Sequence, residues 1–378
     1  MPRDVIRDLL KYGQSVWLDN ISRKLLDSGE LRGMIDKGVA GLTSNPTIFE
    51  KSIGAGSDYD ALIADLASRG KSVFEIYDDL TVRDVRDAAG LFMEVYEETC
   101  GGDGYVSLEV NPDLAESAGD TVVECKRLAA KVDRKNVMFK IPATDAGFEA
   151  ARELLAQGIN INLTLIFSAG QYVRAAETFL GGLGEYVAKG GRAGDVASVA
   201  SVFVSRIDTA VDRMLGERAA KDPRGAALIN SLKGRAAVSN SGVIYGRYCG
   251  IFSQDRFKRL ERAGARPQRA LWASTGTKDP AYSDIKYVTE LIGKNTVNTV
   301  PDKTLYAFLD HGAVAEALTP DPGEAENILK DLSGVGIDVD SVCCILLKKG
   351  LDAFQESFRL LLKTIETKAG TLSRERVR

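Results

Sequence analysis

One lysine interrupts an otherwise apolar segment of this chain. Lys140 lies in the run Val137 to Pro142, where the neighbouring side chains are hydrophobic. Strands that are covered on both faces read as nearly continuous apolar runs, and lysine is seldom buried without a compensating group. A lysine removed from water loses its proton more readily, and the neutral amine can attack a carbonyl carbon. Lys140 is therefore either a nucleophile or a side chain that reaches solvent from the end of a strand.

Other side chains that could take part in catalysis or in substrate binding stand at the ends of further β-rich segments. They are Asp19, Thr43, Asn45, Glu109, Asn162, Thr164, Ser201, Phe203, Arg206, Ser274 and Lys278. Carboxylates can move protons, and arginine offers a planar fork for phosphate. Structural explanations remain open for several of them. Asp19 could cap a helix, Asn45 stands before Pro46 as an N-cap would, and Glu109 could pair with a surface cation.

The fifth of these segments alternates polar and apolar residues. Asn160, Asn162 and Thr164 share one face of the expected strand, and Ile161, Leu163 and Leu165 share the other. Alternation of this kind follows from the strand period of two. The polar face is predicted either to line a wet or catalytic space or to form hydrogen bonds between polar layers inside a barrel.

The elements that must position these residues are eight short strands separated by helical sequence. The expected strands span residues 15–20, 39–43, 105–110, 137–141, 160–167, 196–204, 270–275 and 296–300. This alternation is typical of a single (β/α)8 TIM barrel, whose active site forms at the carboxyl ends of the strands. An open doubly wound sheet is the structural alternative, but no glycine-rich dinucleotide loop follows the first strand.

Additional helices are expected around this barrel, within one domain spanning residues 1–378. A helix over residues 4–12 could cover its amino end, and residues 215–268 predict an elaborated helical layer. The C-terminal region, residues 302–369, predicts two helical stretches, 302–317 and 338–369, that pack across the barrel.

Composition narrows the classes of function. The 378 residues carry 44% hydrophobic and 27% charged side chains and a net charge of −4, which argues against nucleic-acid binding. No segment predicts a membrane span or a signal peptide, so a cytoplasmic protein is expected. The five cysteines show no metal-binding spacing and His311 is the lone histidine, so no metal site is expected.

Two motifs carry a resemblance to a known family. The segments Gly41 to Phe49 and Val137 to Gly147 closely resemble the two signatures of the transaldolase family, in the same order. The resemblance implies a Schiff-base lysine at Lys140 on the fourth strand. It places Asp19, Glu109, Asn162, Thr164, Ser201, Phe203 and Arg206 where that family has its site residues. It also implies cofactor-free transfer of a dihydroxyacetone unit between sugar phosphates in the pentose phosphate pathway.

Roles for these residues follow as a hypothesis. Lys140 would form an imine with the ketose, Asp19 would exchange a proton with the hydroxyl at the cleaved bond, and Glu109 and Thr164 would hold a water. Substrate hydroxyls would be bound by Thr43, Asn45, Asn162 and Ser201. Donors would be sedoheptulose 7-phosphate or fructose 6-phosphate, and acceptors glyceraldehyde 3-phosphate or erythrose 4-phosphate.

One position departs from the family pattern. Other branches carry a Ser-x-Arg phosphate clamp after the seventh strand, whereas here Ser274 is followed two residues later by Gly276. Lys278 is predicted to supply the missing charge.

Two alternative functions stay open. Fructose 6-phosphate aldolases resemble this chain, but they are much shorter and have Gln and Tyr where it has Glu109 and Phe203. A sugar-phosphate-binding barrel without catalysis is the second alternative, and the joint presence of Lys140, Asp19 and Glu109 argues against it. The sequence does not decide between a monomer and a homodimer, and it does not indicate the preferred acceptor.

Overall fold

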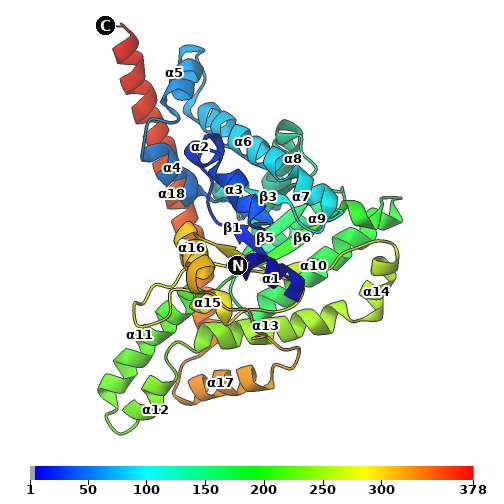
Figure 1. Ribbon diagram of the computed structural model, residues 1–378, viewed down its shortest axis with the longest axis vertical. Helices are drawn as coiled ribbons and strands as arrows, with labels where there is room; N and C mark the ends of the chain where they lie inside the picture. Colours follow the sequence, from blue (N-terminus) through cyan, green and yellow to red (C-terminus); the bar gives the residue numbers. More distant parts are fainter. Residues whose placement is uncertain (1–4, 378) are drawn as a thin grey trace.

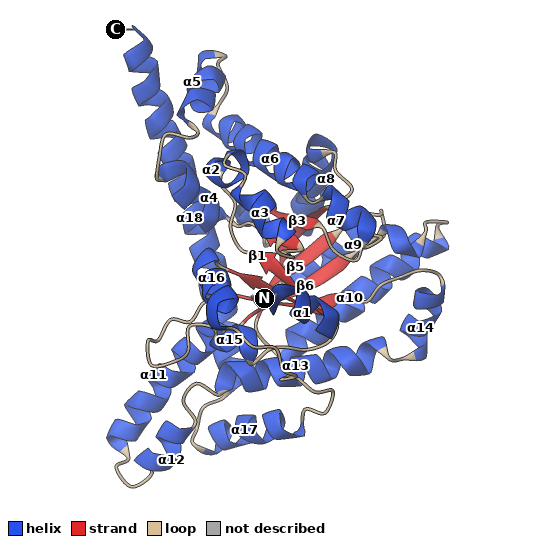
Figure 2. Ribbon diagram, viewed as in Figure 1, coloured by secondary structure: helices blue, strands red, loops and turns tan. Residues whose placement is uncertain are grey.

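Eight parallel strands close into a barrel in which each strand pairs with the next and β8 pairs with β1. The strands are β1 (Gln14–Leu18), β2 (Gly41–Thr43), β3 (Tyr105–Glu109), β4 (Val137–Pro142), β5 (Ile161–Ile166), β6 (Ser198–Phe203), β7 (Arg269–Ala273) and β8 (Thr296–Val300). The computed structural model describes residues 5–377. Figure 2 shows the strands at the centre of the molecule with helices around them. The (β/α)8 prediction is confirmed, and each expected strand segment overlaps one of the eight strands.

Helices follow the first five strands and cover the outside of the barrel. They are α2 (Arg23–Asp27), α3 (Glu30–Asp36), α4 (Pro46–Gly54), α5 (Asp60–Ser68), α6 (Val73–Leu91), α7 (Met93–Glu98), α8 (Ala118–Val132), α9 (Asp145–Leu155) and α10 (Ala169–Ala188). Two short 3-10 turns, η1 (Pro112–Leu114) and η2 (Ala193–Asp195), accompany them. Capping side chains begin several of these helices. Ser72 and Ser168, for example, form capping boxes at the starts of α6 and α10.

Further helices extend this framework at both ends and after β6. The predicted N-terminal helix is α1 (Val5–Tyr12), and residue 4 lies outside the described residues. The predicted layer after β6 consists of α11 (Ser205–Lys221), α12 (Ala226–Ser231), α13 (Ala236–Phe252) and α14 (Asp255–Arg262). The short α15 (Lys286–Thr289) precedes β8.

The C-terminal region differs in part from the prediction. The helix expected over residues 302–317 ends earlier, as α16 (Asp302–His311), and an additional helix, α17 (Gly323–Gly334), was not expected. Pro320 and Pro322 interrupt the helical pattern here, and the second of them stands at the N-cap of α17. The last helix, α18 (Val339–Val377), is longer than predicted.

Helix α18 crosses the carboxyl end of the barrel, as expected. It packs against α4, α5 and α6, which follow β2, and against α11, which follows β6, and it also contacts η1 and β5. Figure 1 shows it passing α4 and α5 and extending beyond them. The helix therefore lies over the end of the barrel at which polar strand-end residues gather.

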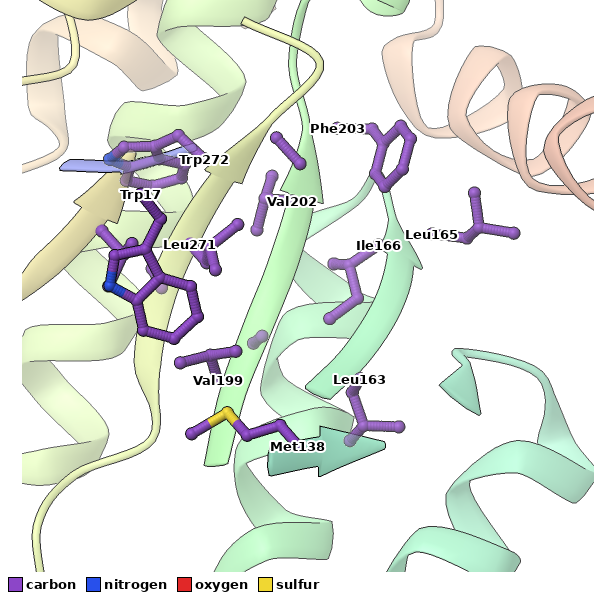
Figure 3. Close-up of a cluster of buried hydrophobic side chains, with 14 of the residues drawn as sticks. Trp17, Met138, Leu163, Leu165, Ile166, Val199, Val202, Phe203, Leu271 and Trp272 are labelled. Carbon is purple, nitrogen blue, oxygen red and sulfur yellow. The ribbon is translucent and has the colours of Figure 1, made fainter. Parts of the chain in front are cut away.

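Strand register places the key polar residues on one inner face. Glu109 pairs with Lys140, and Lys140 pairs with Asn162, across three adjacent strands. Met138, two residues before Lys140, gathers with Val199, Leu271 and Trp17 from other strands in an apolar layer (Figure 3). The polar residues therefore stand on a dry floor at the carboxyl end of the barrel.

The alternation predicted for β5 holds only in part. Register with β6 shifts between Leu163 and Ile166, and Leu165 adopts a positive φ of 58°. This turn brings Leu165 beneath α18, where a Cβ added to Gly350 would lie 2.9 Å from Leu165 Cδ2. Asn160 takes no part in the hydrogen-bond network of Asn162 and Ser201. Its Nδ2 donates to Lys135 O and its Oδ1 accepts from Ala197 N, so it ties backbone segments together.

Two negative findings concern residues 5–377. None of the helices in this range is both long enough and apolar enough to span a membrane. Within the same range, no group of three or more His, Cys, Asp or Glu side chains is placed to hold a metal ion.

The close approach of β2 to Trp17 gives a test of the barrel's packing. A Cβ at Gly41 would lie 2.6 Å from the Trp17 ring, which is held by a 2.8 Å hydrogen bond from Nε1 to Asp103. We expect Gly41→Ala to lower the free energy of unfolding by about 1–3 kcal/mol because the core is overpacked. Urea unfolding followed by circular dichroism would measure it.

Gly33 in α3 provides the matched control, because no atom lies within 4 Å of a Cβ built there. We expect Gly33→Ala to leave stability unchanged or to raise it by up to about 1 kcal/mol. Equal stability changes in the two variants would contradict this description of the packing.

Candidate active site

Lys140 points into the barrel and is only 4% exposed. Its Nζ donates a 3.0 Å hydrogen bond to Ser44 O and lies 3.0 Å from Glu109 Oε2. The ring centroid of Phe354, on α18, lies 5.9 Å from the same nitrogen. The alternative of a lysine that reaches solvent from the strand end is therefore wrong.

Glu109 is a buried carboxylate that faces this lysine directly. Burial raises the pKa of Glu109, the nearby Lys140 opposes that effect, and Asp19 adds to it. Although Lys140 lies at ion-pair distance, neither oxygen of Glu109 accepts a well-aligned hydrogen bond from the described residues, and the buried Thr164 Oγ1 has no such partner. Unpaired buried polar atoms are costly, so these groups have hydrogen-bonding capacity to offer a ligand.

Asp19 follows β1 and keeps some exposed surface in the cavity above Lys140. Thr43 donates a 2.8 Å hydrogen bond to Asp19 Oδ1, and Thr43 Oγ1 lies 2.6 Å from Thr299 Oγ1. Burial raises the pKa of Asp19, whereas the charge of Lys140 and the Thr43 hydrogen bond act in the opposite direction. A carboxylate with a raised pKa that remains near cations is suited to exchanging protons.

Asn162 and Ser201 form a hydrogen-bonded pair beside the lysine. Ser201 donates to Asn162 Oδ1 at 2.6 Å, and Asn162 Nδ2 donates to Ser107 Oγ at 3.1 Å. The network fixes the orientation of the Asn162 amide.

Cationic side chains gather at the outer part of the site. The Arg206 guanidinium lies 5.0 Å from the Phe203 ring centroid, and burial lowers the pKa of Arg206. Ser274 Oγ lies 3.0 Å from Ser205 Oγ, at the first turn of α11, and Lys278 stands exposed at the rim. Neither Arg206 nor Lys278 forms an ion pair with a carboxylate in the described part of the chain, so both charges are available to an anion.

One cavity of about 330 Å³ collects nearly all of the predicted residues. It is lined by Asp19, Thr43, Asn45, Lys140, Thr164, Ser201, Phe203, Arg206, Ser274 and Lys278. Glu109 and Asn162 are absent from its wall and lie just beneath it, beside Lys140 and Ser201. Two larger cavities, of about 440 and 510 Å³, do not border Lys140.

Asn45 caps a helix and also borders the cavity. Its Oδ1 accepts a 3.0 Å hydrogen bond from Ile48 N and thereby caps α4. The residue also borders the cavity, so its amide nitrogen remains free to donate.

Several lining residues were missed from the sequence. Lys51 on α4 adds a further cation, Thr299 supports Thr43, and Phe354 comes from the distant α18. Lys51 lies on α4, the helix in which the first family signature ends, shortly after Asn45. Its proximity to the site could therefore have been inferred. Nothing in the sequence around Phe354 marks it, because its position depends on where α18 crosses the barrel.

Comparison with known proteins identifies the family. A model described as Transaldolase/Fructose-6-phosphate aldolase matches residues 16–365. The chain belongs to this family.

Similar proteins match over almost their full lengths. A transaldolase of Trichodesmium erythraeum is 43% identical over 371 residues, covering 97% of this chain and 98% of that protein. A transaldolase of Saccharopolyspora erythraea is 45% identical over 355 residues, covering 93% and 94%, respectively. A transaldolase of Neisseria gonorrhoeae is 42% identical over 358 residues, covering 95% and 98%.

The hydrogen bond from Thr43 yields a prediction about pH. Because this bond helps to lower the pKa of Asp19, Thr43→Val should raise that pKa further. If Asp19 acts as a base it must be ionised, so the acidic limb of the kcat/KM profile should move to higher pH. The profile would be measured with a coupled transfer assay.

Thr299→Val is the matched control. It removes the hydroxyl beside Thr43 but leaves Thr43 able to donate to Asp19. We expect a smaller displacement of the acidic limb, and an unchanged limb in Thr43→Val would refute the coupling.

Proposed function

We propose that the protein is a transaldolase that transfers a dihydroxyacetone unit from a ketose phosphate to an aldose phosphate. The decisive observation is a buried lysine that contacts Glu109 and shares a cavity with Asp19. Family membership and near-full-length similarity to transaldolases support an enzyme that transfers aldehyde or ketone residues. We also propose that residues 1–378 form one catalytic domain, since the cavity draws residues from both ends of the chain.

The first chemical step would be imine formation on Lys140. The neutral amine adds to the ketose carbonyl carbon, and loss of water gives the imine. Glu109 lies 3.0 Å from Nζ and can take up or return a proton during this exchange. Thr164, whose hydroxyl lacks a partner in the described structure, borders the same space and can hold the water.

Carbon–carbon cleavage would then depend on Asp19. The imine accepts the electron pair of the breaking bond while Asp19 removes the proton of the adjacent hydroxyl. The aldose phosphate leaves, and the three-carbon unit stays bound to Lys140. An acceptor aldehyde reacts with that unit, and Asp19 returns its proton to the new alkoxide. Water then adds to the imine of the new ketose, which releases the product and regenerates Lys140. Thr43, Asn45, Asn162 and Ser201 would bind the substrate hydroxyls.

The phosphate of either sugar would bind at the outer end of the cavity. Arg206 and Lys278 line this end, Ser274 lies beside the first turn of α11, and Lys51 adds positive charge. A charged arginine can form a forked pair with phosphate, and a helix N-terminus adds backbone donors. The substrates would be the four sugar phosphates named from the family resemblance, used in the cytoplasm in the pentose phosphate pathway.

The aldolase alternative differs only in the fate of the three-carbon unit. Fructose 6-phosphate aldolase chemistry would release free dihydroxyacetone instead of passing it to an acceptor. The positions expected to distinguish the groups are Glu109, which contacts Lys140, and Phe203, which packs against Arg206. Both favour transfer.

Chemical trapping tests this function directly. Incubation with fructose 6-phosphate followed by borohydride reduction should leave a three-carbon adduct on Lys140, identified by peptide mass mapping. Lys140→Ala should show neither adduct nor transfer, a loss of at least about 10⁴-fold for removal of a covalent nucleophile. An adduct on another lysine would overturn the mechanism, and an adduct without transfer to erythrose 4-phosphate would favour the aldolase.

Arg206 gives a separate test of phosphate binding. Arg206→Ala should raise KM by about 10- to 100-fold with a smaller change in kcat, as expected for loss of a charge-assisted contact. Steady-state kinetics with erythrose 4-phosphate would measure it. Arg213, on the same helix but outside this cavity, is the control, and its Ala variant should keep the original KM. Equal effects would contradict the assignment.

A further inference from the structure

Phe354 forms the roof of the cavity over the reactive lysine. Its side chain is 2% exposed, it lines the cavity, and its ring centroid lies 5.9 Å from Lys140 Nζ. It also lies 6.4 Å from the Phe203 ring in an edge-to-face arrangement. An apolar ring therefore covers the nitrogen from the side opposite the barrel floor.

The helix that carries this ring is fixed to the barrel mouth on several sides. Ser357 Oγ lies 2.8 Å from Thr47 Oγ1 on α4, and Gln355 Nε2 donates to Pro112 O at 3.4 Å. Gly350 lies against Leu165, whose left-handed backbone turn directs it toward α18. These contacts hold the Phe354 ring in place over the site.

The proposed transfer reaction needs such a cover at one stage. After the first aldose phosphate leaves, the three-carbon unit on Lys140 is a nucleophile with two possible fates. Attack on an acceptor aldehyde, with the Asp19 proton going to the new alkoxide, gives the imine of the new ketose. Water then adds to that imine carbon, the carbon–nitrogen bond breaks, and the product leaves Lys140. Alternatively, that proton adds to the nucleophilic carbon, water adds to the resulting imine carbon, and the carbon–nitrogen bond breaks. The second route releases dihydroxyacetone and free Lys140.

We propose that Phe354 determines which of these fates prevails. Its ring covers the three-carbon unit and limits the access of water until the acceptor has added, and so favours transfer of this unit over its release as free dihydroxyacetone. Closing a site to water suppresses hydrolysis of reactive intermediates. The ring face also stabilises the positive charge that the imine carries. This inference rests on the proposed function and names the residue that keeps the chemistry a transfer.

The partition between the two products provides the test. With saturating fructose 6-phosphate and erythrose 4-phosphate, the ratio of free dihydroxyacetone to sedoheptulose 7-phosphate is measured in the wild type and in Phe354→Leu. We expect the ratio to rise about tenfold, a change of about 1.4 kcal/mol in the difference between the two barriers. Phe354→Met is measured alongside, and circular dichroism confirms that both variants fold.

Phe358 supplies a closely matched control. It lies one turn further along α18, is likewise 2% exposed, and packs against Tyr77 with ring centroids 5.1 Å apart, outside the cavity. Phe358→Leu should therefore leave the product ratio unchanged even if it lowers stability. An equal rise in this control would show that general loosening of α18 is responsible and would overturn the assignment to Phe354.

The remaining outcomes separate this inference from the function on which it rests. If Lys140 is trapped normally and the ratio is unchanged in both Phe354 variants, the role of Phe354 is refuted and the transaldolase proposal stands. If the wild type gives no adduct on Lys140, the proposed function fails and this inference fails with it.

Discussion

The buried contact between Lys140 and Glu109 is the constraint on which the rest of the site depends. Both side chains are nearly inaccessible to solvent, at 4% and 3% exposed, and they lie 3.0 Å apart. Removing two charges from water is costly, and their mutual attraction offsets this cost only if both are held in good geometry. Barrel register provides that geometry, because the two residues pair directly across β3 and β4.

Apolar side chains lie below this contact, and cationic side chains lie above it toward the mouth of the barrel. Trp17, Met138, Val199 and Leu271 form the floor (Figure 3). Phe354 covers the lysine from α18. Toward the mouth, Arg206, Lys51 and Lys278 carry charge with no carboxylate partner among the described residues. Cations in a cleft with low-dielectric walls raise the local concentration of anions. The cavity thus combines a protected reactive centre with an entrance that attracts phosphate.

Site residues could be predicted from the sequence where their position along a strand determines which way the side chain points. Lys140, Asp19 and Thr164 could be placed near one another because strand ends converge once the barrel closes. Residues could not be placed from the sequence where their position depends on how distant helices pack. Phe354 reaches the site through the path of α18, and the turn at Leu165 breaks an alternation that the sequence shows as regular. Helix α17 was likewise not predicted, and Pro320 and Pro322 stand immediately before it.

A crystal structure of the enzyme reduced with borohydride after exposure to fructose 6-phosphate would test the central claim most directly. We expect continuous density from Lys140 Nζ into a three-carbon chain that lies beneath Phe354, with its hydroxyls facing Asp19, Asn162 and Ser201. Glu109 should remain beside the modified nitrogen. An unmodified Lys140, or an adduct directed away from Asp19, would contradict the claim that this buried pair is the reactive centre.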